Sequence, residues 1–580
     1  MPTLAFHIDV TRPAQRELHV RATWTTDAGG EVEFFLPTWT PGSYLLREYS
    51  RHVSRVQAFE PGTDRELACR KTAKNRWVAA TAGGGVELRY RVYAHELTVR
   101  TADVDASHAY WNHTCLLLWP REHRNVPAEL VVDYPPNWSL SCSLPSHVEP
   151  ELEHKRCTLH ARDLDDALDA PVLIGTTQRV EWQVDGVPHA IELDGLGSVS
   201  PPPTLASDLE AITRTAAAVF GGQLPYESYL FQALFAGEGY GGLEHRNSST
   251  LLMPRTSLTT DKGYRDFLGL AAHELFHAWN VKRMRPVEFW DYDYEQENYT
   301  RLLWVMEGWT AYYDDLLVVR AGLMSHKDYL ATMAKNLQGM RSSPGRFELS
   351  LEESSFDAWI RLYRPDENTR NSSQNYYGNG AVAALCLDLG IRRATSGEKS
   401  LDDVMQQLWR DSYENGRGYE LEDVHRAITQ VGGEALIEPL RQLVTGPLDP
   451  ELDEVLVDVG VKVEANDAGK PYLGVALKGG STKVASVTRG GPAYDAGVAP
   501  DDELLAMQNL RVTSGNWQAI LAAIAHVDQP FELLVARRGV IRSLEVTPSA
   551  SPGTIKLAAN QDATEPQVAA RNAWLGAEAD

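Results

Sequence analysis

Hydrophobic and polar residues alternate along several short segments in the first 200 residues of the chain. An apolar side chain occupies every second position in these segments, which include 4–10, 18–24, 86–92 and 180–184. A period of two is typical of half-buried β-strands, and the Asp185-Gly186 pair after the last segment is a favoured hairpin turn. We therefore predict a β-rich, sandwich-like domain over residues 1–200, ending at the three prolines 201–203.

The apolar period becomes helical after residue 206. The segment from Leu268 to Trp279 carries one apolar stripe at i, i+4, i+7 and i+11. A second helix is predicted over 301–321, where Gly322 would end it. We assign residues 204–324 to a second domain and residues 325–446 to a mostly helical third domain.

Residues 445–450, with the sequence TGPLDP, interrupt the helical pattern. A small domain is predicted over 456–549. The remaining residues, 550–580, are rich in Ala, Gln, Asn and Glu, and we expect a flexible tail there. The fold class expected from the whole pattern is multidomain α+β.

Composition narrows the class of protein. The net charge of -24, from 55 basic and 79 acidic residues, argues against a nucleic-acid partner. The five cysteines are widely spaced without a C-x-x-C pair, which favours reduced thiols. The first residues lack a signal-peptide pattern, and no apolar run reaches the ~18–20 residues of a membrane span. We expect a cytoplasmic protein without a membrane span, whose oligomeric state the sequence leaves open.

The segment 273–277 reads HELFH and is the first candidate for chemistry. Residues four apart on a helix differ by only ~40° around its axis, so His273 and His277 project from one face. Two neutral imidazoles at that spacing suit a zinc ion, and Glu274 lies where it can take a proton from water. An ordinary helix with two surface histidines is the alternative.

A catalytic zinc ion usually has three protein ligands, so a third ligand is needed. Arg283 and Asn280 replace the residues that a metzincin motif requires. Carboxylates downstream offer the alternatives Asp291, Asp293, Glu295, Glu297 and Glu307. Glu307 lies within an otherwise apolar helix, where a carboxylate needs a partner such as a metal ion or a salt bridge to Arg283 or Arg285.

The stretch HELFHAWNVKRMRP, followed by MEGWTAYY, resembles the glycyl aminopeptidases, a family of gluzincin metallopeptidases related to aminopeptidase N. The segment 36–44, LPTWTPGSY, resembles the same family, so the similarity spans most of the chain. The resemblance implies one Zn²⁺ held by His273, His277 and Glu307. It also implies a thermolysin-like catalytic domain over 204–324 and a helical domain over 325–446 that completes the active-site cleft.

The resemblance also assigns residues that bind substrate. Gly241-Gly242-Leu243-Glu244-His245 is similar to the G-x-M-E-N segment of aminopeptidase N, which implies that Glu244 holds the free amine of a peptide. An exposed loop carboxylate is the alternative. The segment from Asn375 to Gly380 is similar to Y-x-K-G, which implies that Tyr377 stabilises the oxyanion, with Tyr376 as the alternative. Asn379 replaces the usual lysine, which leaves the local electrostatics open.

The segment 490–505 looks like part of a bacterial-type PDZ domain, and its carboxylate-binding loop would be Tyr472, Leu473, Gly474 and Val475. Such a domain binds a peptide C-terminus by strand addition. The function expected is a zinc aminopeptidase acting on peptides with a free N-terminus, favouring Gly or Ala. The alternatives are a peptide-binding adaptor with little activity and a zinc endopeptidase.

Overall fold

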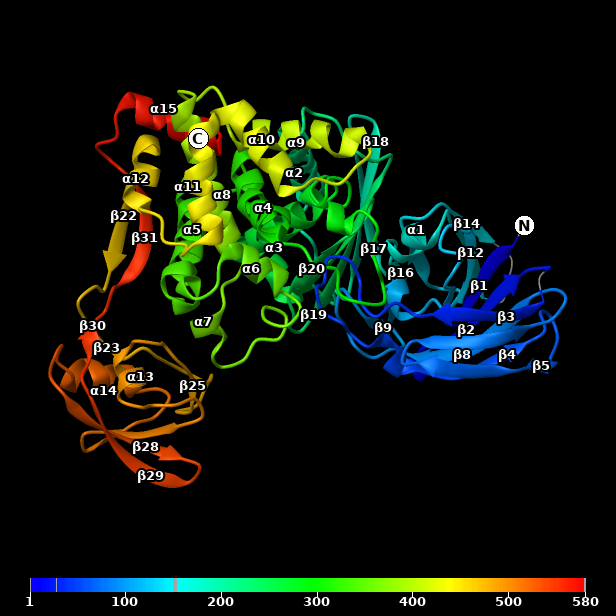
Figure 1. Ribbon diagram of the computed structural model, residues 1–580, viewed down its shortest axis with the longest axis horizontal. Coiled ribbons are helices and arrows are strands. Elements are labelled where there is room, and N and C mark those ends of the chain that lie inside the picture. The colour runs from blue at the N-terminus through cyan, green and yellow to red at the C-terminus, as the bar shows by residue number, and fades with distance from the viewer. Residues whose placement is uncertain (1, 28, 150–153, 578–580) are drawn as a thin grey trace. The chain divides into compact units, whose positions relative to one another are not determined.

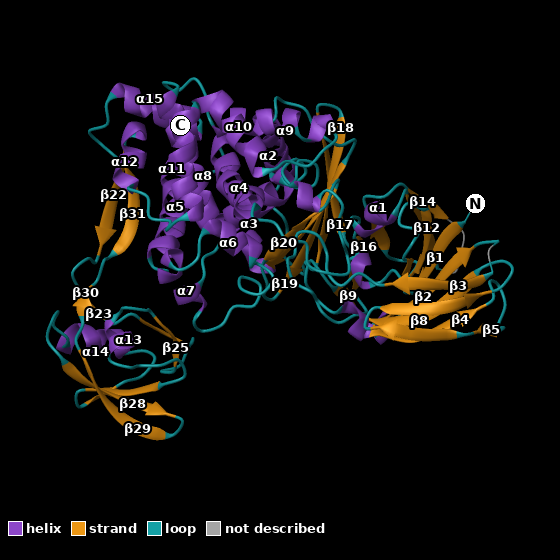
Figure 2. Ribbon diagram, viewed as in Figure 1, coloured by secondary structure: helices purple, strands orange, loops and turns teal. Residues whose placement is uncertain are grey.

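The computed structural model describes residues 2–27, 29–149 and 154–577. The chain divides into two compact units, which we describe separately. The first comprises residues 1–299 and 409–419, and the second comprises 300–408 and 420–580. The first unit is built mainly of strands, whereas the second contains a helical region and a small β-rich module at its C-terminal end (Figures 1 and 2).

The N-terminal part of the first unit is β-rich, as the alternating pattern predicted, and its strands form three sheets. The largest has the strand order β14-β15-β12-β1-β2-β8-β4-β5. Its strands are β1 (Thr3–Asp9), β2 (Glu17–Thr25), β4 (Val53–Phe59), β5 (Glu66–Leu67), β8 (Val86–Tyr93), β12 (Ala128–Tyr134), β14 (Ser146–Glu149) and β15 (Lys155–Ala161). Two four-stranded sheets have the orders β13-β16-β10-β9 and β11-β3-β7-β6. Their strands are β3 (Gly30–Phe35), β6 (Cys69–Ala73), β7 (Arg76–Thr81), β9 (Ala102–Val104), β10 (His108–Trp111), β11 (Trp119–Pro120), β13 (Ser139–Ser141) and β16 (Val172–Gly175). Every second residue of β1 and β2 is buried, which confirms the strands expected at 4–10 and 18–24.

A five-stranded sheet carries the candidate site of the first unit. Its order is β17 (Gln178–Val184), β18 (Val187–Asp194), β19 (Tyr229–Ala236), β21 (Ser248–Pro254) and β20 (Gly241–Glu244). The hairpin predicted at Asp185-Gly186 is confirmed. The hairpin does not belong to the N-terminal sheets, however, because β18 pairs in parallel with β19. The domain limit expected at residue 200 is therefore wrong for the hairpin, which precedes that limit but joins the next sheet. The alternation of apolar and polar residues predicts a strand, but it does not predict which distant strand pairs with it.

Helices α2 (Leu205–Val219) and α3 (Asp261–Phe276) complete the core of this unit. Helix α3 begins after Thr260, whose side chain accepts a hydrogen bond from the Gly263 N–H at 3.1 Å. This cap satisfies one of the free amides at the helix start. The stripe from Leu268 to Leu275 is buried, as its spacing predicted.

The helical region of the second unit begins before the helical domain expected over 325–446, because it includes α4 (Trp309–Arg320), which we assigned from the sequence to residues 204–324. Its principal helices are α4, α5 (His326–Arg341), α6 (Leu351–Phe356), α7 (Thr369–Ser372), α8 (Gly378–Ala394), α9 (Leu401–Asp411), α10 (Leu421–Gly432) and α11 (Ile437–Thr445). The helix expected over 301–321 is present, but its first turn, Trp304–Gly308, is a wider π-helical turn. Gly322 follows it with a φ of +74°, a conformation that suits glycine after a helix.

A small β-rich module lies near the C-terminal end of the second unit. It contains β24 (Val475–Leu477), β25 (Val484–Val487), α13 (Pro492–Asp495), β26 (Glu503–Met507), α14 (Trp517–Ile524), β28 (Phe531–Arg537) and β29 (Val540–Val546) around one apolar core. The strands β22 (Val461–Asn466) and β31 (Thr554–Ala559) pair in antiparallel fashion on either side of it in the sequence.

The flexible tail expected over 550–580 is wrong for most of that segment. Residues 554–559 form β31, and Glu565–Leu575 forms helix α15. Trp574 is fully buried, and its indole N–H donates to the Tyr312 hydroxyl at 2.8 Å. The polar composition of this segment did not indicate that Trp574 and Leu575 are buried. These two apolar side chains anchor the short helix α15.

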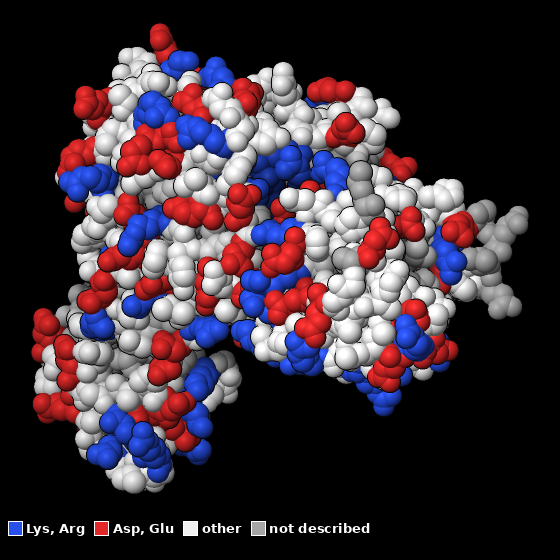
Figure 3. All heavy atoms as spheres, turned by 45° about the vertical axis from the view of Figure 1, so that its right-hand side comes forward, with Lys and Arg blue, Asp and Glu red and all other residues white. Residues whose placement is uncertain are grey.

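On the face shown in Figure 3, acidic and basic side chains are interspersed. Within the residues that the structure describes, no helix has the length and apolar character needed to cross a bilayer. All five cysteines are free thiols.

Candidate active site

The HELFH segment closes helix α3 in the first unit. His273 and Glu274 lie in its last turn and His277 directly follows it. The Nε2 atoms of the two imidazoles are 3.1 Å apart, and His277 Nδ1 is 2.8 Å from the Asn280 carbonyl oxygen. A proton on Nδ1 can be donated to that carbonyl, which leaves the Nε2 lone pair for a metal ion. Two nitrogens sharing a tetrahedral zinc lie about 3.3 Å apart, so the imidazoles fit such an ion.

Two carboxylates lie beside this pair of histidines. One ligand atom from each of Glu244, Glu274 and His277 lies within 4.8 Å of the others, and all three residues are buried. Glu244 is only 3% exposed, and its Oε1 has no hydrogen-bond partner among the described residues. Leaving a buried carboxylate oxygen unpaired is costly, so such an atom indicates a place for a ligand.

Strand β20 brings Glu244 to this place, at the free edge of the five-stranded sheet. Gly242, two residues earlier, faces the catalytic candidate Glu274: a Cβ added there would lie 1.9 Å from Glu274 Oε1. Gly241 has more space, because the nearest atom to such a Cβ would be Arg100 Nη1 at 3.5 Å. The Arg100 side chain donates to the Gly242 carbonyl at 3.1 Å and so holds the strand. The two glycines therefore differ: an added Cβ would overlap Glu274 at Gly242 but would make only an ordinary contact at Gly241.

A buried ionic network supports the end of the same strand. Lys282 Nζ is 2.7 Å from Asp169 Oδ1, and His245 Nδ1 lies 3.1 Å from that oxygen. Burial alone would raise the pKa of Asp169, but the charge of Lys282 and the hydrogen bond with His245 hold it well below its usual range. Burial would lower the pKa of Lys282, yet the attraction of Asp169 raises it. Both groups are therefore charged at neutral pH. Sequence reasoning missed this network, because Asp169 lies far away along the chain.

In the second unit, Glu307 lies on the π-helical turn Trp304–Gly308 and is only 2% exposed. Such turns are frequent at functional sites. The neighbouring Gly308 lies against helix α8: a Cβ on Gly308 would be 2.7 Å from the Gly380 Cα and 2.8 Å from the Tyr376 carbonyl oxygen. Close contact of two glycines thus holds the Glu307 turn against the start of α8.

The two candidate tyrosines directly precede α8. Their rings stack with centroids 4.9 Å apart. Tyr376 is fully buried, and burial, together with the charges of Tyr363 and Glu307, raises the pKa of its hydroxyl well above the usual value. The Tyr377 hydroxyl is 3.0 Å from that of Tyr363. The Tyr376 hydroxyl is therefore protonated at neutral pH and can donate a hydrogen bond.

Glu295, one of the other carboxylates considered as a metal ligand, has arginine partners. Glu295 pairs with Arg76 at 2.6 Å and with Arg121 at 2.7 Å. Arg283 and Arg285, which the sequence offered as salt-bridge partners of Glu307, donate hydrogen bonds within the first unit. Arg283 donates to the carbonyls of residues 246 and 278, and Arg285 donates to the carbonyl of residue 290.

The loop Tyr472-Leu473-Gly474-Val475 lies at the start of the C-terminal module. Leu473 is buried in the module's core, and Gly474 has a φ of +75°. The Gly474 carbonyl accepts a hydrogen bond from the Thr488 N–H at 2.8 Å, and the Leu473 carbonyl accepts one from Ala493 at 2.9 Å. The loop is therefore an ordered turn whose two carbonyls point into the module.

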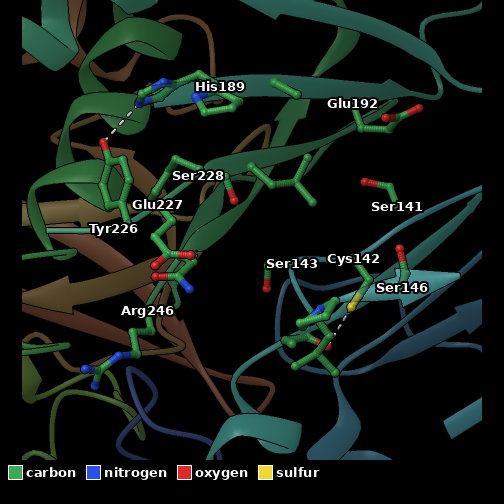
Figure 4. Close-up of a pocket in the computed structure, with 18 of the residues that line it drawn as sticks. Ser141, Cys142, Ser143, Ser146, His189, Glu192, Tyr226, Glu227, Ser228 and Arg246 are labelled. Atoms are coloured by element: carbon green, nitrogen blue, oxygen red, sulfur yellow. Dashed lines mark hydrogen bonds between the residues drawn. The ribbon is translucent and has the colours of Figure 1, made fainter. Parts of the chain in front are cut away.

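A large cavity of the first unit does not coincide with these residues. It has a volume of about 1340 Å³, and Figure 4 shows its serine-rich wall, Ser141, Ser143 and Ser146, together with His189, Tyr226 and Glu227. His273, Glu274, His277 and Glu244 are not part of its lining. The candidate site is thus defined by its donor atoms and not by cavity size.

The two imidazoles of His273 and His277, at this separation, could hold a metal ion, and such a pair one helical turn apart is typical of a metallopeptidase. Among protein-family models, Peptidase M61 N-terminal domain matches residues 5–176 and M61 glycyl aminopeptidase matches residues 266–383. The two matches together span half of the chain. The chain belongs to the M61 glycyl aminopeptidase family and is therefore a metallopeptidase of the aminopeptidase type.

One solved structure has the same fold over nearly the whole chain. An aminopeptidase N family protein from Idiomarina loihiensis is 29% identical, with a TM-score of 0.91, and the match covers 99% of this chain and all of that one. An M1 zinc metallopeptidase from Deinococcus radiodurans is 18% identical over 78% of this chain and 95% of that one, with a TM-score of 0.48. None of the curated proteins that were compared matches the chain.

Proposed function

We propose that this protein is a zinc-dependent aminopeptidase in which Glu244 binds the free amine of a peptide substrate. One observation carries the proposal: a buried carboxylate oxygen of Glu244 lacks a partner among the described residues, and this carboxylate lies beside Glu274 and His277. An ammonium group supplies the missing charge and hydrogen bonds. A blocked N-terminus would leave the carboxylate unpaired, which favours exopeptidase action.

His273, His277 and Glu307 would hold the zinc ion. The separation of the two imidazoles and the buried, acidic side chain of Glu307 support this set. Zinc, when bound, polarises the scissile carbonyl and lowers the pKa of water toward ~7.

The chain's own residues have distinct roles in the proposal. Glu274 accepts the proton of the attacking water and later delivers it to the leaving amine. Tyr377 donates a hydrogen bond to the developing oxyanion, with Tyr376 as the alternative donor. By family resemblance, Gly or Ala is the preferred N-terminal residue.

The C-terminal module would act as a PDZ domain that binds a peptide C-terminus at residues 472–475. Strand β24 pairs on one side with β25, and strand addition on its other side is the binding mode proposed. The free thiols fit the reducing, cytoplasmic compartment that we propose.

Hydrolysis of glycyl- and alanyl-arylamides by zinc-loaded protein tests the function. Two matched variants, Glu274→Gln and Glu244→Gln, each replace a carboxylate by an amide of the same shape. We expect Glu274→Gln to keep zinc and lose turnover. We expect Glu244→Gln to keep zinc and lose the preference for free-amine over N-acetylated substrates.

The two other functions give different results. Zinc-loaded wild type that cleaves neither substrate class would favour a peptide-binding adaptor. Cleavage of N-acetylated substrates as fast as free ones would favour an endopeptidase and remove the role given to Glu244.

A further inference from the structure

The segment 36–44 of the N-terminal region ends in a tight turn. After β3 the chain forms a largely buried loop, and the Ser43 N–H donates to the Thr40 carbonyl at 3.1 Å. Pro41 and Gly42 occupy the two central positions, and Gly42 has a φ of +87°. A type II turn requires a positive φ at its third residue and favours proline at its second, so the sequence TPGS suits this geometry.

The tip of this turn meets the carboxylate that the proposed function assigns to the substrate amine. A Cβ added to Gly42 would lie 2.3 Å from Glu244 Oε2 and 2.6 Å from Glu244 Oε1. Real Cβ atoms essentially never come so close to another heavy atom. The Gly42 backbone therefore closes one side of the Glu244 carboxylate, whose Oε1 still lacks a partner among the described residues.

The turn is held firmly in this place. The Thr38 N–H donates to the Tyr294 carbonyl at 2.8 Å, and the indole N–H of Trp39 donates to the Asp293 carbonyl at 2.8 Å. These contacts assign a role to the aromatic segment 289–294, which supports the loop that carries Gly42.

The N-terminal region also holds strand β20 at two further points. Arg100 donates to the Gly242 carbonyl at 3.1 Å, two residues before Glu244. Asp169 Oδ1 is 3.1 Å from His245 Nδ1, one residue after it. Glu244 thus lies between two anchored neighbours, and Gly42 abuts its side chain directly.

We propose that Gly42 is a positioning residue that sets the direction of the Glu244 carboxylate and so determines how tightly the substrate's N-terminal amine binds. The inference rests on the proposed function, because it needs Glu244 to be the amine-binding group. It extends that function to a residue in the N-terminal region, which acts through Glu244 and not on the reacting atoms.

The test compares Gly42→Ala with Gly186→Ala, both in a zinc-loaded Glu274→Gln background that does not turn over. Gly186 has a φ of +83° and nothing within 4 Å of an added Cβ, so it reproduces the backbone strain without the contact. Calorimetry measures the binding of triglycine and of N-acetyl-triglycine. We expect Gly42→Ala to weaken triglycine binding at least tenfold and to leave the acetylated peptide unaffected, and we expect Gly186→Ala to change neither.

A second pair of variants tests whether Gly42→Ala weakens triglycine binding by displacing the Glu244 carboxylate. Glu244→Asp shortens the side chain by one methylene and withdraws the carboxylate from residue 42. In the combined variant, which carries Gly42→Ala and Glu244→Asp, the alanine no longer contacts the carboxylate. The affinity for triglycine should therefore be within twofold of the affinity of the Glu244→Asp variant alone. This comparison still decides the matter if Gly42→Ala alone fails to fold. If the loss of affinity in the combined variant equals the product of the losses in the two single variants, the proposal is overturned.

The possible failures are distinguishable. If the background protein binds both peptides equally well, or if Glu244→Gln changes nothing, the amine-binding role of Glu244 is wrong and the role of Gly42 falls with it. If the background protein discriminates and Gly42→Ala behaves like Gly186→Ala, only the inference about Gly42 is overturned. Equal loss for both peptides would show a general structural effect and overturn it as well.

Discussion

Replacing Gly242 by alanine should damage catalysis through Glu274. The added Cβ would lie 1.9 Å from Glu274 Oε1, whereas ordinary contacts begin at 3.4 Å. Relieving the overlap requires a movement of roughly 1.5 Å by the carboxylate or by the strand that bears Gly242. Misplacing a reacting group by about 1 Å can cost on the order of 100-fold in rate, or about 2.8 kcal/mol. We therefore expect kcat/KM to fall about 100-fold.

The assay is hydrolysis of a glycyl-arylamide, with zinc content and thermal unfolding measured on the same samples. Gly241→Ala is the matched comparison, because it lies on the same strand and its Cβ would meet only Arg100 Nη1, at 3.5 Å. We expect it to lose several-fold at most. If Gly242→Ala retains kcat/KM within threefold of Gly241→Ala while both bind zinc, the argument from this contact is refuted.

Three further predictions concern stability and metal. Asp169→Asn should lower the free energy of unfolding of the first unit by about 3–5 kcal/mol, because it leaves Lys282 charged and buried; urea unfolding that shifts by less than 1 kcal/mol would contradict this. Burial lowers the pKa of His113 to about 4, below the ordinary value of 6.5, so the unfolded chain binds the extra proton and stability should fall by about 3 kcal/mol as the pH decreases from 6.5 to 4. A His113→Gln variant should lack that part of the slope in pH-dependent unfolding; an unchanged slope would exclude His113 as its source. Glu307→Gln should lose zinc in metal analysis after dialysis, whereas Glu274→Gln should retain it; equal retention would remove Glu307 from the ligand set.

Local patterns were sufficient for several elements. The alternation in 4–10 and 18–24 corresponds to β1 and β2, and the stripe from Leu268 onward corresponds to α3. Both follow from backbone periodicity, which each segment carries by itself. The pattern failed where the outcome depended on a distant partner, as for the hairpin β17–β18 and for the helix that docks through Trp574.

The sequence by itself determined the donor types and their local spacing: two imidazoles one helical turn apart, a carboxylate between them, and Glu307 in an apolar helix. It also carried the family resemblance, which rests on the order of residues. Only the tertiary structure decided that Gly42 and Gly242 face carboxylates, and that Asp169 neutralises Lys282. These contacts join residues that are 32 to 202 positions apart in the chain. Such a position needs glycine because a side chain from a distant part of the chain lies against its backbone. The neighbouring sequence carries no signal of this, since the space available for a Cβ is set by how other segments pack.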